Sequence, residues 1–446
     1  MRIWQHEMQS PVNIVTRVAK VVQVVSSFFK NATRLRYKVY RDKEIALKRA
    51  ISSLQRIQEK RPHCLWTGMQ LKQAIEEGKR IQDIRESYHY HKSTSHWTQV
   101  GDKVTKDFFH VAGPKNLNLP IKFLQRQDGS LTNDPQELRA IATDFYRNLL
   151  STETRPPLSE ALRQKVWATI PASVTSEMNH ILDAPFGMDE IMLALKAIPA
   201  HSCPGLDGLP SSFFLKYWEV IGVDILSAIQ AMYDSGDMPD SVSEGLIFLI
   251  PKGPGPSSDV RKWRPITLLN TLYKIMAKTL CNRLQTVLRN IIHDSQTGFL
   301  KDRSIMDNIF VFWEMTSLAR TMNEDLAVLF LDFEKMYDRV EWGFLEGVMQ
   351  RMGFSPSWIR GVAATYTNAH SRVLVARDVG PRFKLSRSVR QGCPLAPLLF
   401  LIFAEALHSF IHTQPVNVRG MNSLELSEPI MDSKFADDTT LYVNGS

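Results

Sequence analysis

The sequence predicts an α+β protein in which a helical first half precedes a second half that carries the strands. In the first half, apolar residues recur at roughly helical spacing, and in the second half short apolar runs end at turn residues. The composition, with 44% hydrophobic and 22% charged residues among 446, is that of an ordinary globular chain and excludes a wholly disordered one. The length suits about three domain-sized units.

The charge balance permits a polyanionic partner without requiring one, since 54 Lys and Arg against 46 Asp and Glu give a formal net charge of +8. The four cysteines lie far apart in the sequence, so their spacing fits neither a disulfide framework nor a zinc knuckle, and we expect a reducing compartment. We predict no signal peptide, because the N-terminus (Met1–Trp4) lacks a continuous apolar stretch. We predict no membrane span, because the most apolar run, Leu398–Ala404, stops at Glu405.

Residues 1–112 are predicted to form a basic, helical extension. Apolar residues recur at helical spacing between the basic ones, and this pattern fits a solvated basic helix and a nucleic-acid-contacting arm equally well. The apolar positions are Ile45, Leu47, Ile51 and Leu54. The basic positions are Arg34, Arg36, Lys38, Arg41, Lys43, Lys48 and Arg49.

Residues 113–240 are predicted to continue the helical part. A short hairpin is expected around Asp128-Gly129, and Pro135–Leu150 has the pattern of a helix started by proline. The densest turn segment of the chain is Pro204–Pro210, and we expect Ser211 or Ser212 to cap the helix that follows it.

Residues 241–446 hold the predicted strands. Leu246–Ile250 is an apolar run, and Arg264–Leu269 is expected to return beside it. Leu326–Leu331 has the pattern of a buried strand, and Lys434–Val443 that of a hairpin with an Asp-Asp tip. The helices expected here open at Asn270 or Thr271 and run through Leu288, and cover Trp342–Met352 and Pro394–Phe410.

Carboxylates follow two of these strands. Asp332 closes the Leu326–Leu331 run, and Asp437 and Asp438 are adjacent at the hairpin tip, where they repel each other. If the strands lie side by side, the three carboxylates converge into a ligand set that suits Mg²⁺. Two such ions roughly 3.5–4 Å apart support nucleotidyl transfer. Taken alone, each motif is more typical of an ordinary turn or strand end.

Five segments of the second half form an ordered set of motifs. They are Trp263–Leu268, Gln296–Arg303 with Asp307–Ile309, Leu331–Trp342, Arg390–Phe400 and Phe435–Asp438. In this order they closely resemble the motifs of reverse transcriptases from non-LTR (LINE-type) retrotransposons. Further upstream, Trp97, Gly101–Lys103, Lys106 and Phe108-Phe109 resemble the linker that precedes this polymerase in plant LINE elements.

The resemblance implies a right-hand polymerase. Residues 113–240 would lead into the fingers, and residues 241–446 would form fingers and a palm whose antiparallel sheet is packed by helices. The implied function is RNA-directed DNA synthesis from an RNA template, a DNA primer and dNTPs, with two Mg²⁺ ions and Mn²⁺ as a substitute. The implied metal ligands are Asp332, the carbonyl of Phe333, Asp437 and Asp438.

The resemblance also implies contacts to the incoming nucleotide. Tyr337 would lie under its sugar and exclude a 2′-hydroxyl, although without the resemblance a core aromatic is the better interpretation of this residue. Gln391 would steady the nucleotide or merely occupy a turn. Lys252 and Arg264 would reach the triphosphate, or else belong to a solvated basic loop. Arg303 is a further candidate for contact with template or nucleotide.

Three departures from the family pattern bear on activity. Met336 stands where the family has Ala, and Ala396 stands where it has Ser. The sequence stops at Ser446, where the family continues with a primer grip and a thumb, so we expect a truncated chain without a thumb. The alternative to an active enzyme is an inactive remnant that at most binds RNA or DNA. A viral RNA polymerase is disfavoured because Ala436, rather than Gly, precedes the Asp pair.

A group II intron maturase is also disfavoured, because its maturase domain would follow the palm. Nucleus and cytoplasm both suit an intact element, and we expect neither secretion nor membrane embedding. The sequence gives no oligomeric state.

Overall fold

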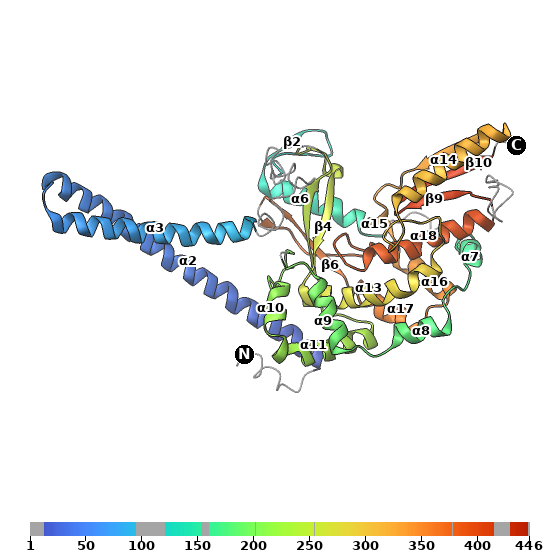
Figure 1. Ribbon diagram of the computed structural model, residues 1–446, viewed down its shortest axis with the longest axis horizontal. Coiled ribbons are helices and arrows are strands. Elements are labelled where there is room, and N and C mark those ends of the chain that lie inside the picture. Colours follow the sequence, from blue (N-terminus) through green and yellow to red (C-terminus); the bar gives the residue numbers. More distant parts are fainter. Residues whose placement is uncertain are drawn as a thin grey trace. The chain divides into compact units, whose positions relative to one another are not determined.

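The computed structural model describes residues 13–94, 121–152, 160–200, 202–253, 255–376, 378–413 and 429–444 (Figure 1). The chain divides into two compact units. One comprises residues 21–116 with a few N-terminal residues, and the other comprises residues 117–446 with residues 6–20. The domain boundaries expected at 112 and 240 stay predictions.

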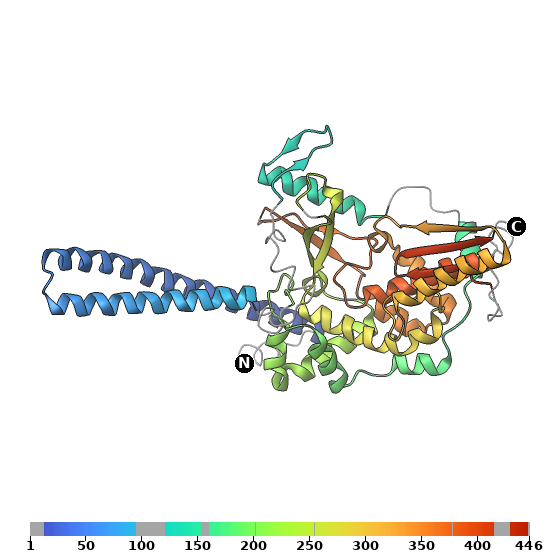
Figure 2. The ribbon, with the colours of Figure 1, turned by 45° about the horizontal axis from the view of Figure 1, so that its top comes forward.

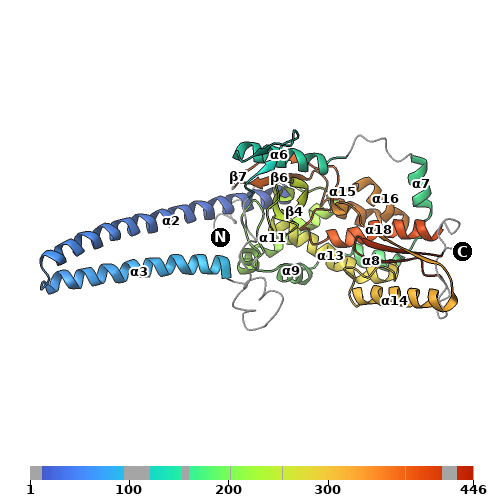
Figure 3. The same ribbon diagram turned by 90° about the horizontal axis from the view of Figure 1, so that it is seen from above.

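The unit of residues 21–116 contains a hairpin of long helices, α2 (Ile14–Lys60, whose first turns belong to the other unit) and α3 (Leu65–Thr94) (Figures 2 and 3). The two helices touch where Gly78 faces Ile51. The basic helix predicted in this part is confirmed, and the seven basic positions named above are exposed. Whether they contact nucleic acid stays open.

The other unit begins with a small hairpin and a helix. β1 (Leu124–Gln125) pairs with β2 (Leu131–Thr132), which confirms the turn predicted at Asp128-Gly129. Asp134 then caps α6 (Pro135–Leu149), since its side chain accepts hydrogen bonds from two backbone N–H groups of the first turn.

A series of helices follows α6. Its members are α7 (Glu160–Ala168), α8 (Ser176–Asp183), α9 (Met188–Ala197), α10 (Ser211–Lys216), α11 (Trp218–Ser235) and α12 (Asp240–Ser243). The expected serine cap at 211 or 212 is wrong. Ser211 is already the first helical residue, and Pro210 precedes it without a side-chain cap.

The larger sheet joins a hairpin to a strand from far along the chain. β3 (Gly245–Pro251) and β4 (Trp263–Leu268, after the short 3₁₀ turn η1, Val260–Lys262) form the predicted antiparallel hairpin. On its other side β3 pairs in parallel with β6 (His370–Val375). β7 (Asp378–Val379) and β8 (Phe383–Lys384) complete the sheet by pairing with β6.

Helix α6 covers this sheet. Tyr146 of α6 is fully buried, and its hydroxyl donates a hydrogen bond to the carbonyl of Trp263 at 3.1 Å. Trp263 is itself 1% exposed, so the two large rings anchor the base of the hairpin in the core.

The second sheet is antiparallel and holds the carboxylate motifs. Its order is β5 (Leu326–Leu331), β10 (Asp438–Asn444) and β9 (Asp432–Phe435). Helix α14 (Ile305–Met322) covers one face, where Met315 and Ala319 pack against Tyr442 (Figure 2). The predicted strand over residues 326–331 and the predicted hairpin over residues 434–443 are therefore confirmed. The expected burial of that strand is wrong, because none of its residues is buried and Phe330 is 74% exposed.

The remaining helices support both sheets. They are α13 (Thr271–Ile291), α15 (Met336–Arg339), α16 (Trp342–Met352), α17 (Pro356–Ala363) and α18 (Ala396–Thr413). Within the described part of the chain, α18 alone is long and apolar enough to cross a bilayer by length and composition. It packs against α7, α13 and α16, and 61% of it is buried, as is common for a core helix.

Candidate active site

Three carboxylates meet at one end of the second sheet. Thr439 of β10 pairs with Leu331 of β5, so Asp438 and Asp332 lie beside each other where the two antiparallel strands meet the turn. Asp437 belongs to the tight turn between β9 and β10. Asp332 and Asp438 are exposed and Asp437 is half-buried. The structure therefore brings together the three carboxylates predicted from separate motifs.

Electrostatics confirm that these groups are neighbours. The pKa of Asp438 is raised by partial burial and then by the negative charges of Asp437 and Asp332. Three carboxyl groups that repel one another, from two strand ends, form a hard oxygen ligand set of the kind that Mg²⁺ and Mn²⁺ bind. The donor set of these three carboxylates therefore fits a divalent metal, and the predicted role of the Phe333 carbonyl stays a prediction.

The turn that carries Asp437 is held by a side chain to which the sequence assigned no role. Ala436 has a positive φ of 58°. Its N–H donates to Gln296 Oε1 at 2.9 Å, and its carbonyl accepts from Gln296 Nε2 at 3.2 Å. Gln296 Oε1 also accepts from the N–H of Gly298 at 3.0 Å, and a Cβ on Gly298 would collide with the backbone of Ala436. The Gln296–Gly298 segment therefore fits closely against the Asp437 turn.

Tyr337 lies beside the carboxylates. Its ring stacks on Phe400 of α18 with centroids 4.7 Å apart. Burial and then the charge of Asp437 raise the pKa of its hydroxyl well above the usual range, which places the hydroxyl near that carboxylate. No described protein atom hydrogen-bonds the buried hydroxyl. Tyr337 thus joins the α15 segment to the site, with a polar atom left for another partner.

Gln391 is oriented by a buried acid. Its Nε2 donates to both oxygens of Asp338, at 3.2 and 3.1 Å. Asp338 is 2% exposed, and burial raises its pKa to about 7 against the opposing effects of Lys335, Gln391 and Lys252. No role was predicted for Asp338, although its position directly after Tyr337 was a usable signal.

The two predicted cations lie on the β3–β4 hairpin. Arg264 pairs with Ile250 across the hairpin. Lys252 directly follows β3, and its backbone N–H donates a hydrogen bond to the carbonyl of Lys262. Both side chains are exposed. The charge of Lys252 acts on Lys335 and on Asp338, so this end of the hairpin approaches the α15 segment.

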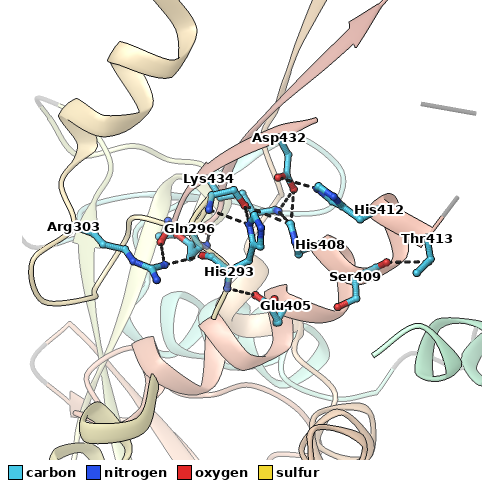
Figure 4. A network of polar contacts seen from close by, with 12 residues as sticks. His293, Gln296, Arg303, Glu405, His408, Ser409, His412, Thr413, Asp432 and Lys434 are labelled. Carbon is cyan, nitrogen blue, oxygen red and sulfur yellow. Dashed lines mark hydrogen bonds and ion pairs between the residues drawn. The ribbon is translucent and has the colours of Figure 1, made fainter. Parts of the chain in front are cut away.

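Arg303 does not join this group. Its guanidinium donates to the carbonyls of His293 at 2.7 Å, Gln296 at 2.8 Å and Ile292 at 3.1 Å, and it pairs with Asp294 (Figure 4). The side chain is 11% exposed. Its donors therefore satisfy carbonyls after the end of α13, and the predicted contact with template or nucleotide stays a prediction.

Comparison with known proteins defines the class. Residues 250–446 match the family "Reverse transcriptase (RNA-dependent DNA polymerase)". This stretch begins within β3 and contains both sheet ends that carry the site. The second half of the chain is therefore a reverse transcriptase domain of mixed α/β structure, a family that generally uses divalent metals.

Similar proteins narrow the class further. The chain is 32% identical over 343 residues to the "Transposon TX1 uncharacterized 149 kDa protein" of Xenopus laevis, covering 76% of this chain and 25% of that protein. It is 26% identical over 259 residues to a "Retrovirus-related Pol polyprotein from type-1 retrotransposable element R2" of Nasonia vitripennis, covering 58% and 24%. The "RNA-directed DNA polymerase from mobile element jockey" of Drosophila melanogaster is 24% identical over 283 residues, covering 61% and 30%.

These similarities identify residues 250–446 as the RNA-directed DNA polymerase domain of a non-LTR retrotransposon. The chain spans about a quarter of the length of the first curated relatives that it matches.

Proposed function

We propose that this chain catalyses RNA-directed DNA synthesis with two bound Mg²⁺ ions. The observation that carries the proposal is the convergence of Asp332, Asp437 and Asp438 at the shared end of β5 and β10 inside a reverse transcriptase domain. The substrates would be an RNA template, a DNA primer and dNTPs. A primer 3′-hydroxyl attacks the α-phosphate of a dNTP, forming a phosphodiester bond and releasing pyrophosphate.

The carboxylates would hold the metals, together with the carbonyl of Phe333, and Mn²⁺ would substitute for Mg²⁺. The ions supply activation of the 3′-oxygen and stabilisation of the leaving pyrophosphate. The protein contributes position, because Gln296 fixes the backbone on which Asp437 sits. Partial burial and the repulsion from Asp437 and Asp332 raise the pKa of Asp438. A bound cation would relieve this repulsion and stabilise the ionised carboxylates.

The incoming nucleotide would lie between the sheet end and the β3–β4 hairpin. Tyr337, held flat against Phe400, would support the sugar and exclude a 2′-hydroxyl. Gln391, fixed by Asp338, would steady the nucleotide. Lys252 and Arg264, both exposed on the hairpin, would attract the triphosphate.

In the finer description that we propose, the sheet of β3, β4 and β6 belongs to the fingers and the sheet of β5, β9 and β10 to the palm. We also propose a plant LINE origin, on the linker resemblance between Trp97 and Phe109. Those linker residues lie outside the described part of the chain. An intact element of this kind would act on chromosomal DNA in the nucleus.

The test is primer extension by the purified chain on an RNA template with Mg²⁺ and dNTPs. Asp332→Asn and Asp437→Asn should abolish extension while RNA binding persists. Asp325→Asn is the matched control, because Asp325 is exposed just before the other end of β5, and it should leave extension unchanged.

The rival function is that of an inactive remnant that binds RNA. Met336, half-buried beside Tyr337, is the residue that favours it. Salt-dependent RNA binding without extension by the wild-type chain would support the remnant and overturn the catalytic proposal. Extension that appears only in Met336→Ala would locate the defect at this side chain.

A further inference from the structure

A second cluster of ligand-type side chains lies away from the three carboxylates, at the opposite end of β9. His408 and His412 are four residues apart on α18, and Asp432 is the first residue of β9 (Figure 4). Their ligand atoms all lie within 4.8 Å of one another. His408 Nδ1 is 3.1 Å from Asp432 Oδ2, and His412 Nε2 is 3.5 Å from Asp432 Oδ1.

We propose that His408, His412 and Asp432 form a binding site for a divalent transition-metal ion of the Zn²⁺ class. Residues four apart on a helix point the same way, and two imidazoles with one carboxylate are a common ligand set for zinc. At a Zn–N distance near 2.05 Å, neighbouring ligands of a tetrahedral ion are about 3.3 Å apart. The separations of the two imidazole nitrogens from the carboxylate, 3.1 Å to Oδ2 and 3.5 Å to Oδ1, are close to that value.

The ammonium group of a buried lysine, Lys434, already contacts two of the proposed ligand atoms. Lys434, 2% exposed, donates to Asp432 Oδ2 and lies 3.2 Å from His408 Nδ1. Its ammonium therefore competes with a metal for the same atoms. Replacing Lys434 by Met keeps the apolar stem and removes the charge, so this variant should bind metal more tightly than the wild-type chain.

The surroundings hold the site together. The ring of His293 stacks on His408 with centroids 4.0 Å apart, and Glu405 accepts a hydrogen bond from the N–H of His293 at 3.3 Å. An ion bound here would tie α18 to β9, the strand that leads to the Asp437 turn. The site itself does not depend on the proposed polymerase activity.

The experiment is a titration of the purified full chain with Co²⁺, followed by its visible absorption, and with Zn²⁺, followed by bound metal after desalting. Lys434→Met should bind one equivalent of either ion, about tenfold or more tightly than the wild type. Adding His412→Ala to Lys434→Met should abolish that binding. His180→Ala is the matched control, since His180 is exposed on α8, and it should change nothing.

The proposal is overturned if the folded wild-type chain binds no metal, or if folded Lys434→Met binds no more metal than Lys434→Met with His412→Ala. If Lys434→Met does not fold, the wild type and His412→Ala decide the matter. Loss of one bound equivalent in His412→Ala then supports the site, and equal metal content overturns it. Because metal content is the readout, an inactive polymerase would not affect the result.

Discussion

The contact between Gln296 and the Asp437 turn allows a test of whether a residue that is not itself a predicted metal ligand positions one. Replacing Gln296 by Met keeps the side-chain length but removes the groups that bond the backbone N–H and carbonyl of Ala436. The N–H of Gly298 loses the same acceptor. Ala436 is 7% exposed, so water replaces the lost partners poorly.

The magnitude follows from the number of buried donors left unpaired. Each costs roughly 1–3 kcal/mol, so two donors give about 2–6 kcal/mol of lost unfolding free energy. We expect the lower part of this range, because the neighbouring Asp437 is half-buried and solvent reaches the turn. A displacement of Asp437 by an ångström would lower the rate of extension about 10²-fold.

Two assays check this. Urea denaturation of Gln296→Met gives the change in unfolding free energy, and primer extension under stabilising conditions gives the change in kcat/KM. Gln350→Met is the control, since Gln350 is exposed on α16 and should change neither quantity. Wild-type extension by a folded Gln296→Met would refute the view that this side chain positions the metal ligands.

The other predictions concern the nucleotide side of the site. Tyr337→Ala should raise ribonucleotide incorporation relative to dNTP about 10²-fold, measured by competitive extension; unchanged selectivity would remove Tyr337 as the sugar gate. The pKa of Asp338, about 7 when folded and near 3.9 when unfolded, means that this group favours the folded state most below pH 4 and that the contribution is lost as pH rises through 7. Asp338→Asn should therefore gain stability relative to wild type, by up to about 4 kcal/mol, between pH 4 and pH 8 in urea denaturation. Stability curves of the two proteins that stay parallel across that range would contradict the conclusion that burial raises the pKa of Asp338.

Local sequence signals were enough where the structure is decided locally. Trp342–Met352 is a helix with the predicted ends, because its apolar spacing and the positive-φ Gly353 that follows it both lie within one segment. The β3–β4 hairpin was predictable for the same reason, since both apolar runs and the loop between them are contiguous. The strand of β6 was not predicted, because its parallel pairing with β3 joins segments more than a hundred residues apart.

Side-chain roles were predictable only where the strand register alone decides them. Asp332 follows the last residue of β5 and Asp438 is the first residue of β10. Because the two strands pair in antiparallel fashion, these two ends lie side by side. The bonds of Arg303 to several carbonyls beyond α13 were not predicted, because a cation in this motif gives no sign that those carbonyls need donors. Gln296 was overlooked for the converse reason, since its partner Ala436 is 140 residues away.

The cluster of His408, His412 and Asp432 shows which part of a buried polar site is visible in the sequence alone. Asp432, Ser433 and Lys434 are all buried, which breaks the alternation expected of a strand with one wet face. Asp432 and Lys434 share one face at a spacing of two, and His408 and His412 share one helix face at a spacing of four. Each spacing is visible in the sequence, but a buried Lys-Asp pair is costly unless other groups complete it. The need for those groups was the clue that β9 packs against a polar part of α18, and only the strand-to-helix contact shows which residues supply it.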